Sequence, residues 1–331
     1  MTNHAAHFHQ FLRHQTERDW ADLVERLVPH IHAVDQTATR IWFHFFPLGL
    51  ASAFEDTPDP APLVRTLELM GRYRLHDQID SSHAFLYGHR YWPTVKQVTL
   101  ERAAEGPEPA DLMDAASEIG RRAADRAGVE PAILFGIGAV ALMTFRQVGP
   151  EALRASPGHA ALAPAAPRRS PDRVLSARAR DDSQGLFGFL RGPRKRWTIT
   201  FDERQTDASF PLIHEQTLTG AAASDKRNYH SQEPRCIVAE GPIPVRCRSA
   251  FCGTCWIGVL GGADKLSDVE DLERTRIREF GYIDTDDPKP IIRLACQSVA
   301  TGAVSIVIPP WNGIVGRYLR ARQTGGAGAG S

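Results

Sequence analysis

The chain has 331 residues, of which 42% are hydrophobic and 24% charged, and its 39 basic residues equal its 39 acidic ones. This length allows two domains and more than one hydrophobic core. The zero net charge argues against a general nucleic-acid-binding protein, which needs a basic excess to replace phosphate counterions. We therefore expect a soluble globular protein with more than one domain and no nucleic-acid partner.

The N-terminus, Met1 to His7, has no basic region followed by an apolar core, so no secretory signal is expected. The longest apolar run, Ala132 to Phe145, is shorter than the roughly 20 residues that span a bilayer. It is typical of a buried core helix, and no transmembrane segment is predicted. These features favour a cytoplasmic protein.

Residues 1–150 are predicted to form an all-α domain, because apolar residues recur at three- and four-residue spacing. Pro29 and Pro47 interrupt this pattern, and residues 55–60 have the composition of a connection. The domain resembles no family that we can name. The expected helices cover residues 5–27, 31–46, 62–73, 82–104, 109–127 and 131–147.

Residues 151–194 are rich in Ala, Pro, Arg and Ser, and are expected to form a linker. Leu186 to Leu190 is apolar enough to dock on a neighbouring surface. The basic run Arg191 to Arg196 could meet an acidic partner, but short basic runs are more often solvated.

Residues 195–320 are predicted to form a second, strand-containing domain, so that the whole chain is α+β. Ser267 followed by Glu270 has capping-box spacing, which predicts a helix over 268–280. Residues 321–331 are rich in Gly and Ala, and a flexible tail is expected there. The expected strands cover residues 197–201, 210–218, 256–260, 291–295 and 304–308.

Four of the five cysteines have the spacing of an iron–sulfur site: Cys247, Cys252 and Cys255 follow C-x4-C-x2-C, and Cys296 lies downstream. This is the ligand spacing of a plant-type [2Fe–2S] cluster, in which each iron takes two thiolates. A structural zinc site is the alternative, but it usually pairs two Cys-x2-Cys couples, and the second couple is absent. Cys236 is left outside the ligand set and is expected to be a buried free thiol.

The segment 195–318 resembles the [2Fe–2S] ferredoxin family. The evidence is the run Cys247 to Cys255, with Gly253 and Thr254 before the third thiol, and Arg293 to Gln297 around the fourth. The first three thiols have plant-type spacing, whereas Arg-Leu-Ala-Cys-Gln looks like the adrenodoxin-type branch. The resemblance implies a β-grasp fold, a mixed sheet with a helix across it, and one-electron transfer by a cluster held by Cys247, Cys252, Cys255 and Cys296.

Two features depart from the family pattern. The gap from Cys255 to Cys296 is longer than in plant-type members, and residues 210–235 lack the usual Leu-Leu-Glu-Ala helix before the cluster loop. Phe251 is also larger than expected within the loop, where it could shield the cluster from water. These departures concern the surface around the cluster and therefore its partner.

The stretch Asp264 to Asp287 carries nine acidic residues against four basic ones. Adrenodoxin-type ferredoxins use an acidic helix in a similar place to dock on basic partners, so the resemblance implies a docking face here. Such steering raises association rates and fades with salt. An ordinary solvated helix is the competing interpretation, because Arg274, Arg276 and Arg278 dilute the charge.

Ten of the thirteen histidines lie before residue 90, which makes metal or haem ligation conceivable. Neither a Glu-x-x-His pair for a di-iron bundle nor a Cys-x-x-Cys-His haem-attachment sequence is present. Surface or core histidines are therefore the default expectation.

These observations predict an electron-transfer protein whose [2Fe–2S] domain is tethered to a helical module that docks it to a redox complex or oligomerises. No Gly-x-Gly-x-x-Gly motif follows a predicted strand, so a separate reductase and a separate electron acceptor are expected as partners. Whether the chain is an enzyme stays open. One alternative is the iron–sulfur subunit of an oxidoreductase whose helical domain holds an active site. Another is a redox sensor.

Overall fold

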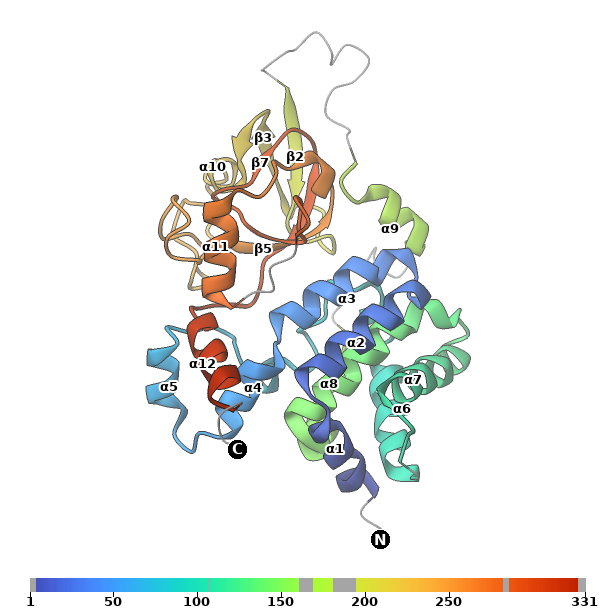
Figure 1. Ribbon diagram of the computed structural model, residues 1–331. Helices are drawn as coiled ribbons and strands as arrows, with labels where there is room; N and C mark the ends of the chain where they lie inside the picture. Colours follow the sequence, from blue (N-terminus) through green and yellow to red (C-terminus); the bar gives the residue numbers. More distant parts are fainter. Residues whose placement is uncertain (1–3, 107, 161–168, 181–194, 282–285, 327–331) are drawn as a thin grey trace. The chain divides into compact units, whose positions relative to one another are not determined.

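A computed structural model of the protein describes residues 4–106, 108–160, 169–180, 195–281 and 286–326. The expected Leu186–Leu190 docking segment and the basic run up to residue 194 lie outside these ranges. The chain forms two compact units, the first made of residues 1–51 and 74–175 and the second of residues 52–73 and 176–331 (Figure 1). The fold is mixed helix and sheet with a helical N-terminal region, which confirms the α+β prediction.

The first unit is helical. Its short 3-10 helices are η1 (Val28–His30), η2 (Leu75–Gln78) and η3 (Tyr87–Tyr91). Its α-helices are α1 (His4–His14), α2 (Glu17–Leu27), α3 (Ala33–Phe45), α6 (Trp92–Glu105), α7 (Leu112–Ala127), α8 (Pro131–Ala155) and α9 (Pro171–Ala177), with α4 (Leu48–Glu55) at its border with the second unit.

Helix α8 is the centre of the first unit, and α1, α2, α3, α6 and α7 pack against it (Figure 1). Gly120 of α7 faces α8 closely, because a Cβ there would lie 2.4 Å from the Phe135 ring. By length and composition alone α8 could cross a membrane, but 72% of its most apolar stretch is buried within the protein. A helix that is largely buried within the protein is typical of a core helix, and the sequence predicted a core helix for residues 132–145.

Several expected helices of the first unit have different bounds. The predicted helix 5–27 is two helices, because Thr16 caps α2 in a capping box with Asp19. The predicted helix 82–104 begins only at Trp92, since Asp35 of α3 accepts hydrogen bonds from the backbone N–H groups of Tyr87 and Gly88 and holds that segment in η3. Helix α8 continues to Ala155 after a kink at Gly149, whose φ is 80°.

The second unit contains all the strands found within the described residues. Its helices are α5 (Pro60–Thr66), α10 (Leu218–Ala222), the 3-10 helix η6 (Ala263–Lys265), α11 (Asp271–Phe280) and α12 (Gly316–Gly326). Its strands are β1 (Met70–Gly71), β2 (Arg196–Thr200), β3 (Ser209–Ile213), β4 (Gln216–Thr217), β5 (Trp256–Gly261), β6 (Ile292–Leu294), β7 (Val299–Ala300), β8 (Val304–Val307) and β9 (Trp311–Asn312).

Five strands form one mixed sheet in the order β3-β2-β8-β5-β6. Strands β2 and β8 are parallel, with Ile199 opposite Val304, whereas the other neighbours are antiparallel. Helix α10 packs against β3, and α11 packs against β6. Two further pairs, β4 with β7 and β1 with β9, complete the unit.

The predicted helical domain, residues 1–150, includes residues 52–73. In the structure this segment belongs to the second unit instead. Met70 pairs with Asn312 across β1 and β9, and the backbone N–H of Ile314 donates to the Leu67 carbonyl. Local sequence spacing carries no signal of such a distant pairing.

The predicted linker 151–194 and tail 321–331 also contain regular structure. Residues 151–155 belong to α8 and residues 171–177 form α9. Beyond α9, Arg178 forms a partly buried ion pair with Glu203, and the Ala179 N–H donates to Ser305 Oγ. Helix α12 runs to Gly326, and residues 327–331 lie outside the described ranges.

Candidate metal centre

The strand pairing of β5 and β6 brings the two ends of the cysteine pattern together. Cys255 directly precedes β5 and Cys296 follows β6 by two residues. The antiparallel register places Trp256 opposite Leu294, and the Ala295 N–H donates to the Cys255 carbonyl at 3.0 Å. Cys247 and Cys252 lie in the loop that leads into β5, so all four predicted ligands lie at one end of this strand pair.

The thiols approach one another in two pairs. The Cys252 thiol hydrogen-bonds to the sulfur of Cys247, and the Cys252 backbone N–H donates to the same sulfur at 3.3 Å. The Cys255 thiol donates to the sulfur of Cys296, which lowers the pKa of Cys296 to about 6 and raises the pKa of Cys255, as does its burial. This pairing matches the two-thiolates-per-iron arrangement of a [2Fe–2S] cluster.

Backbone N–H groups of the loop turn toward sulfur. Burial alone would raise the pKa of Cys247, but hydrogen bonds from Ser249, Phe251 and Cys252 lower it below its ordinary value. The Ala250 backbone likewise hydrogen-bonds to Cys296 and helps to lower its pKa. Because the thiolate is the form that binds metal, these donors favour metal ligation.

Two loop residues adopt left-handed backbone angles that turn the chain around the sulfurs. The φ of Ala250 is 60° and that of Gly253 is 66°. A Cβ at Gly253 would lie 2.6 Å from the ring of Phe280, so glycine is needed there for space as well as for its φ. Because Phe280 is distant from Gly253 in the sequence, local spacing gives no sign of this contact with α11.

Two side chains also donate to the sulfurs. The Thr254 hydroxyl donates to Cys252 Sγ at 2.8 Å, and Gln297 Nε2 donates to Cys296 Sγ at 3.3 Å. Thr254 and Gln297 both belong to the motifs that carry the ferredoxin resemblance, but their role as donors to sulfur was not predicted from the sequence. A hydroxyl or amide adjacent to a ligand cysteine is the signal that could have indicated this role.

The site is buried on one side and open on the other. Cys255 and Cys296 are 1% and 5% exposed, whereas Cys247 and Cys252 are half-buried. Phe251 was expected to shield the cluster from water, but its side chain is 70% exposed. The Arg276 guanidinium lies 5.5 Å from its ring centre.

The acidic stretch 264–287 is not uniform. Glu273 is buried and forms an ion pair with the buried Arg293, so it cannot contribute to a docking face. Asp264, Asp268, Glu270 and Asp271 are exposed and precede the first full turn of α11 or lie within it.

Cys236 is placed apart from the ligand contacts. It is 2% exposed, its thiol donates to the Pro242 carbonyl at 3.2 Å, and burial raises its pKa to about 11. These are the properties of a buried structural thiol.

No group of three or more His, Cys, Asp or Glu side chains gathers around a single-ion position within the described residues. A [2Fe–2S] cluster does not require one, since each iron takes only two protein ligands.

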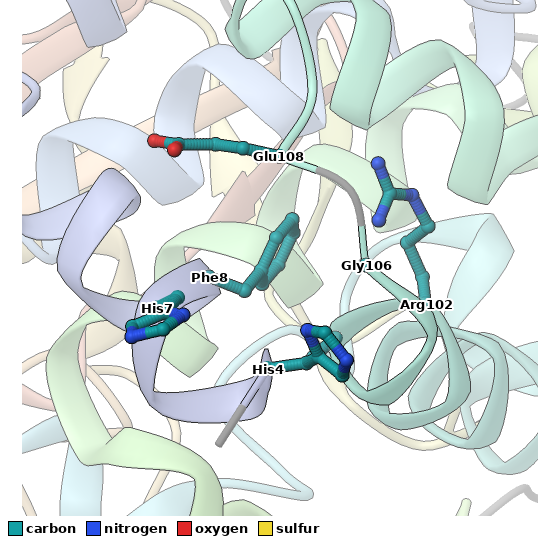
Figure 2. Close-up of a pocket in the computed structure, with 7 residues that line it drawn as sticks. His4, His7, Phe8, Arg102, Gly106 and Glu108 are labelled. Atoms are coloured by element: carbon teal, nitrogen blue, oxygen red, sulfur yellow. The ribbon is translucent and has the colours of Figure 1, made fainter. Parts of the chain in front are cut away.

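The N-terminal histidines line a small cavity in the first unit. Its volume is about 240 Å³, and His4 and His7 of α1 border it together with Arg102 of α6 and Glu108 (Figure 2). Arg102 is already paired with Glu118 at 2.6 Å. Deeper in the unit, Nδ1 of the buried His83 lies 2.9 Å from Nδ1 of His89.

No protein-family model matches the chain, and no curated protein and no solved structure shows significant similarity to it.

Proposed function

We propose that this chain is a one-electron carrier whose second unit binds a [2Fe–2S] cluster through Cys247, Cys252, Cys255 and Cys296. The observation that carries the proposal is the pairwise contact of the four thiols, Cys247 with Cys252 and Cys255 with Cys296, at one end of the β5–β6 pair. A cluster held there would supply reversible one-electron transfer.

We infer further that the second unit has a β-grasp fold. The mixed five-stranded sheet supports this, with its parallel pair β2–β8 and antiparallel strands on both sides. Helices α10 and α11 against β3 and β6 are consistent with the helix-covered sheet that the ferredoxin resemblance implies.

The chain's own residues would hold charge and control solvent access at this site. The N–H groups of Ser249, Phe251 and Cys252 and the Thr254 hydroxyl are donors that stabilise negative charge on sulfur. Burial of Cys255 and Cys296 excludes water from one side, while the half-buried Cys247 and Cys252 leave the other side open to a partner. The helical unit would then serve docking or oligomerisation.

The test is the cofactor content of the full chain purified without oxygen. We expect about two iron and two sulfide per chain, together with visible absorption and an electron paramagnetic resonance signal on reduction. Serine at any one of the four ligand positions should weaken or abolish both signals. Cys236→Ser is the matched control and should retain them.

Three results would contradict the proposal: bound zinc in place of iron, no absorption from the reconstituted chain, or loss of the cluster in Cys236→Ser. A second metal or chromophore in the wild-type chain would instead favour the oxidoreductase-subunit alternative.

A further inference from the structure

Three arginines lie in or next to the cysteine loop. Arg246 and Arg248 flank Cys247 in the sequence, and both are exposed. Arg276 comes from α11, and its guanidinium lies 5.5 Å from the ring centre of Phe251. Two exposed arginines are therefore sequence neighbours of Cys247, and a third lies beside Phe251, the residue before Cys252.

Two carboxylates accompany these arginines. Glu240 forms an ion pair with Arg248, and Glu279 forms one with Arg276. Arg246 has no carboxylate partner within the described residues. Among the described side chains named here, three arginines therefore stand against two glutamates, which leaves a positive excess.

The exposed acidic residues lie at the other end of α11. Asp268, Glu270 and Asp271 stand at its start, and Pro288 is held there by the hydrogen bond from the Val269 N–H. The final residue of α11, Phe280, is the one that packs on Gly253 of the loop. Ten helical residues span about 15 Å, which exceeds the Debye length of about 8 Å at physiological salt. A partner on the loop would therefore respond to the arginines more than to these acids.

An exposed aromatic ring lies among the arginines. Phe251 is 70% exposed, the largest value among the exposed large hydrophobic side chains of the described residues. Interfaces are enriched in aromatic residues and arginine, and an aromatic side chain gains most from burial when a partner covers it. Its position next to Cys252 makes the loop the natural place for such contact.

We propose that Arg246, Arg248, Phe251 and Arg276, here called the arginine face, dock an acidic surface of a redox-partner protein. This inference rests on the proposed function, since it assigns the partner chemistry of the same cluster. It replaces the acidic stretch 264–287, which the sequence suggested as the docking face, with a surface of opposite charge.

The first experiment measures the electrostatic potential at the cluster. The cluster-loaded full chain is reduced with dithionite and mixed in stopped flow with anionic hexacyanoferrate(III) or cationic hexaamminecobalt(III). In Arg246→Glu at low salt, we expect oxidation by the anion to slow about tenfold and oxidation by the cation to accelerate, with both changes fading at high salt. Arg276→Glu should behave alike.

Arg274→Glu is the matched control, because it makes the same charge change on the same helix. Residues two positions apart lie about 200° apart around a helix, and Arg274 donates to the Asp287 carbonyl rather than facing the loop. The rates of Arg274→Glu should stay within about twofold of wild type.

The second experiment uses protein acceptors of opposite charge: cytochrome b5, which is acidic around its haem edge, and cytochrome c, which is basic there. We expect salt-sensitive reduction of cytochrome b5 that Arg246→Glu slows and Asp271→Lys leaves unchanged. Phe251→Ala, which keeps the backbone N–H that donates to Cys247, should weaken the binding of cytochrome b5 more than it changes the rate with hexacyanoferrate.

A preference for cytochrome c that Asp271→Lys removes would overturn the inference and restore the acidic stretch as the docking face. Equal rates for Arg246→Glu and wild type with both ions would also overturn it. Both outcomes require a loaded cluster, whose absorption is recorded first. Absence of that absorption is failure of the proposed function instead.

Discussion

Glu273 of α11 and Arg293 of β6 form an ion pair that is closed to solvent, with side chains 1% and 0% exposed. Arg293 Nε and Nη2 each donate to a Glu273 oxygen at 2.9 Å, and the Leu294 N–H donates to the same carboxylate at 2.7 Å. Since Cys296 follows Leu294 by two residues, the pair joins α11 to the segment that carries the fourth predicted ligand.

Glu273→Gln should destabilise the second unit by about 3–5 kcal/mol, because the Arg293 charge would remain buried without a carboxylate. Chemical unfolding followed by circular dichroism and by cluster absorption measures this free energy. Asp271→Asn, an exposed change on the same helix, should cost less than about 0.5 kcal/mol. A similar loss in both variants would show that the pair makes no special contribution.

Comparing Gly253→Ala with Gly128→Ala separates two reasons why a position requires glycine: a left-handed backbone and a lack of space for a Cβ. Their φ angles are 66° and 67°, but a Cβ at Gly253 would meet the Phe280 ring at 2.6 Å, whereas a Cβ at Gly128 meets nothing within 4 Å. We expect Gly128→Ala to cost about 1–2 kcal/mol from backbone strain alone. Gly253→Ala should cost more and should also reduce the iron content per chain. An equal loss of stability in the two variants, with unchanged iron content, would mean that the Phe280 ring moves aside at little cost.

Thr254→Val should lower the reduction potential of the cluster, because it removes the hydroxyl that donates to Cys252 Sγ. A hydrogen bond worth about 1 kcal/mol corresponds to roughly 40 mV for one electron. A redox titration followed by electron paramagnetic resonance gives the potential. Thr254→Ser, which retains the hydroxyl, is the control, and equal potentials for the two variants would argue against the assigned role.

The helical unit should lose stability in acid through His83. Burial, followed by the neighbouring His89, holds the pKa of His83 well below 6.5. Below pH 6.5 the unfolded chain therefore binds a proton that the folded chain does not. The free energy of unfolding should fall by up to about 1.4 kcal/mol per pH unit for this group, and the effect should vanish above about pH 7.5.

Hydrogen exchange of the α8 amides at about pH 5.5 and about pH 7.5 measures this dependence. His83→Gln should show a shallower dependence on pH than wild type, whereas His30→Gln, an exposed change, should not. The same slope in all three proteins would exclude His83 as the source.

The strands beside the candidate site were predictable because their patterns are local. Residues 256–260 and 304–308 were expected as strands and form β5 and β8 almost residue for residue. The cysteine spacing predicted four candidate ligands, and the structure brings these thiols together in pairs.

Long-range contacts account for what the sequence did not reveal. Asp35 binds the N–H groups of Tyr87 and Gly88 from another helix, and no pattern near residue 87 indicates this. Glu273 was counted among docking acids because its partner, Arg293, is distant in sequence. The Thr254 hydroxyl could equally have bonded to backbone, and only the folded loop directs it to sulfur.

The pairing of β1 with β9 has a consequence for how the protein is made. Leu63, Leu67 and Leu69 are buried in the second unit, yet they leave the ribosome long before Trp311 and Asn312, whose strand pairs with β1. During synthesis these leucines therefore stay exposed while residues 74–175, the later part of the first unit, are made and fold. Apolar surface exposed in this way is prone to aggregation. A C-terminal truncation before residue 311 would therefore leave β1 without its partner strand, and a chaperone requirement is expected for the nascent chain.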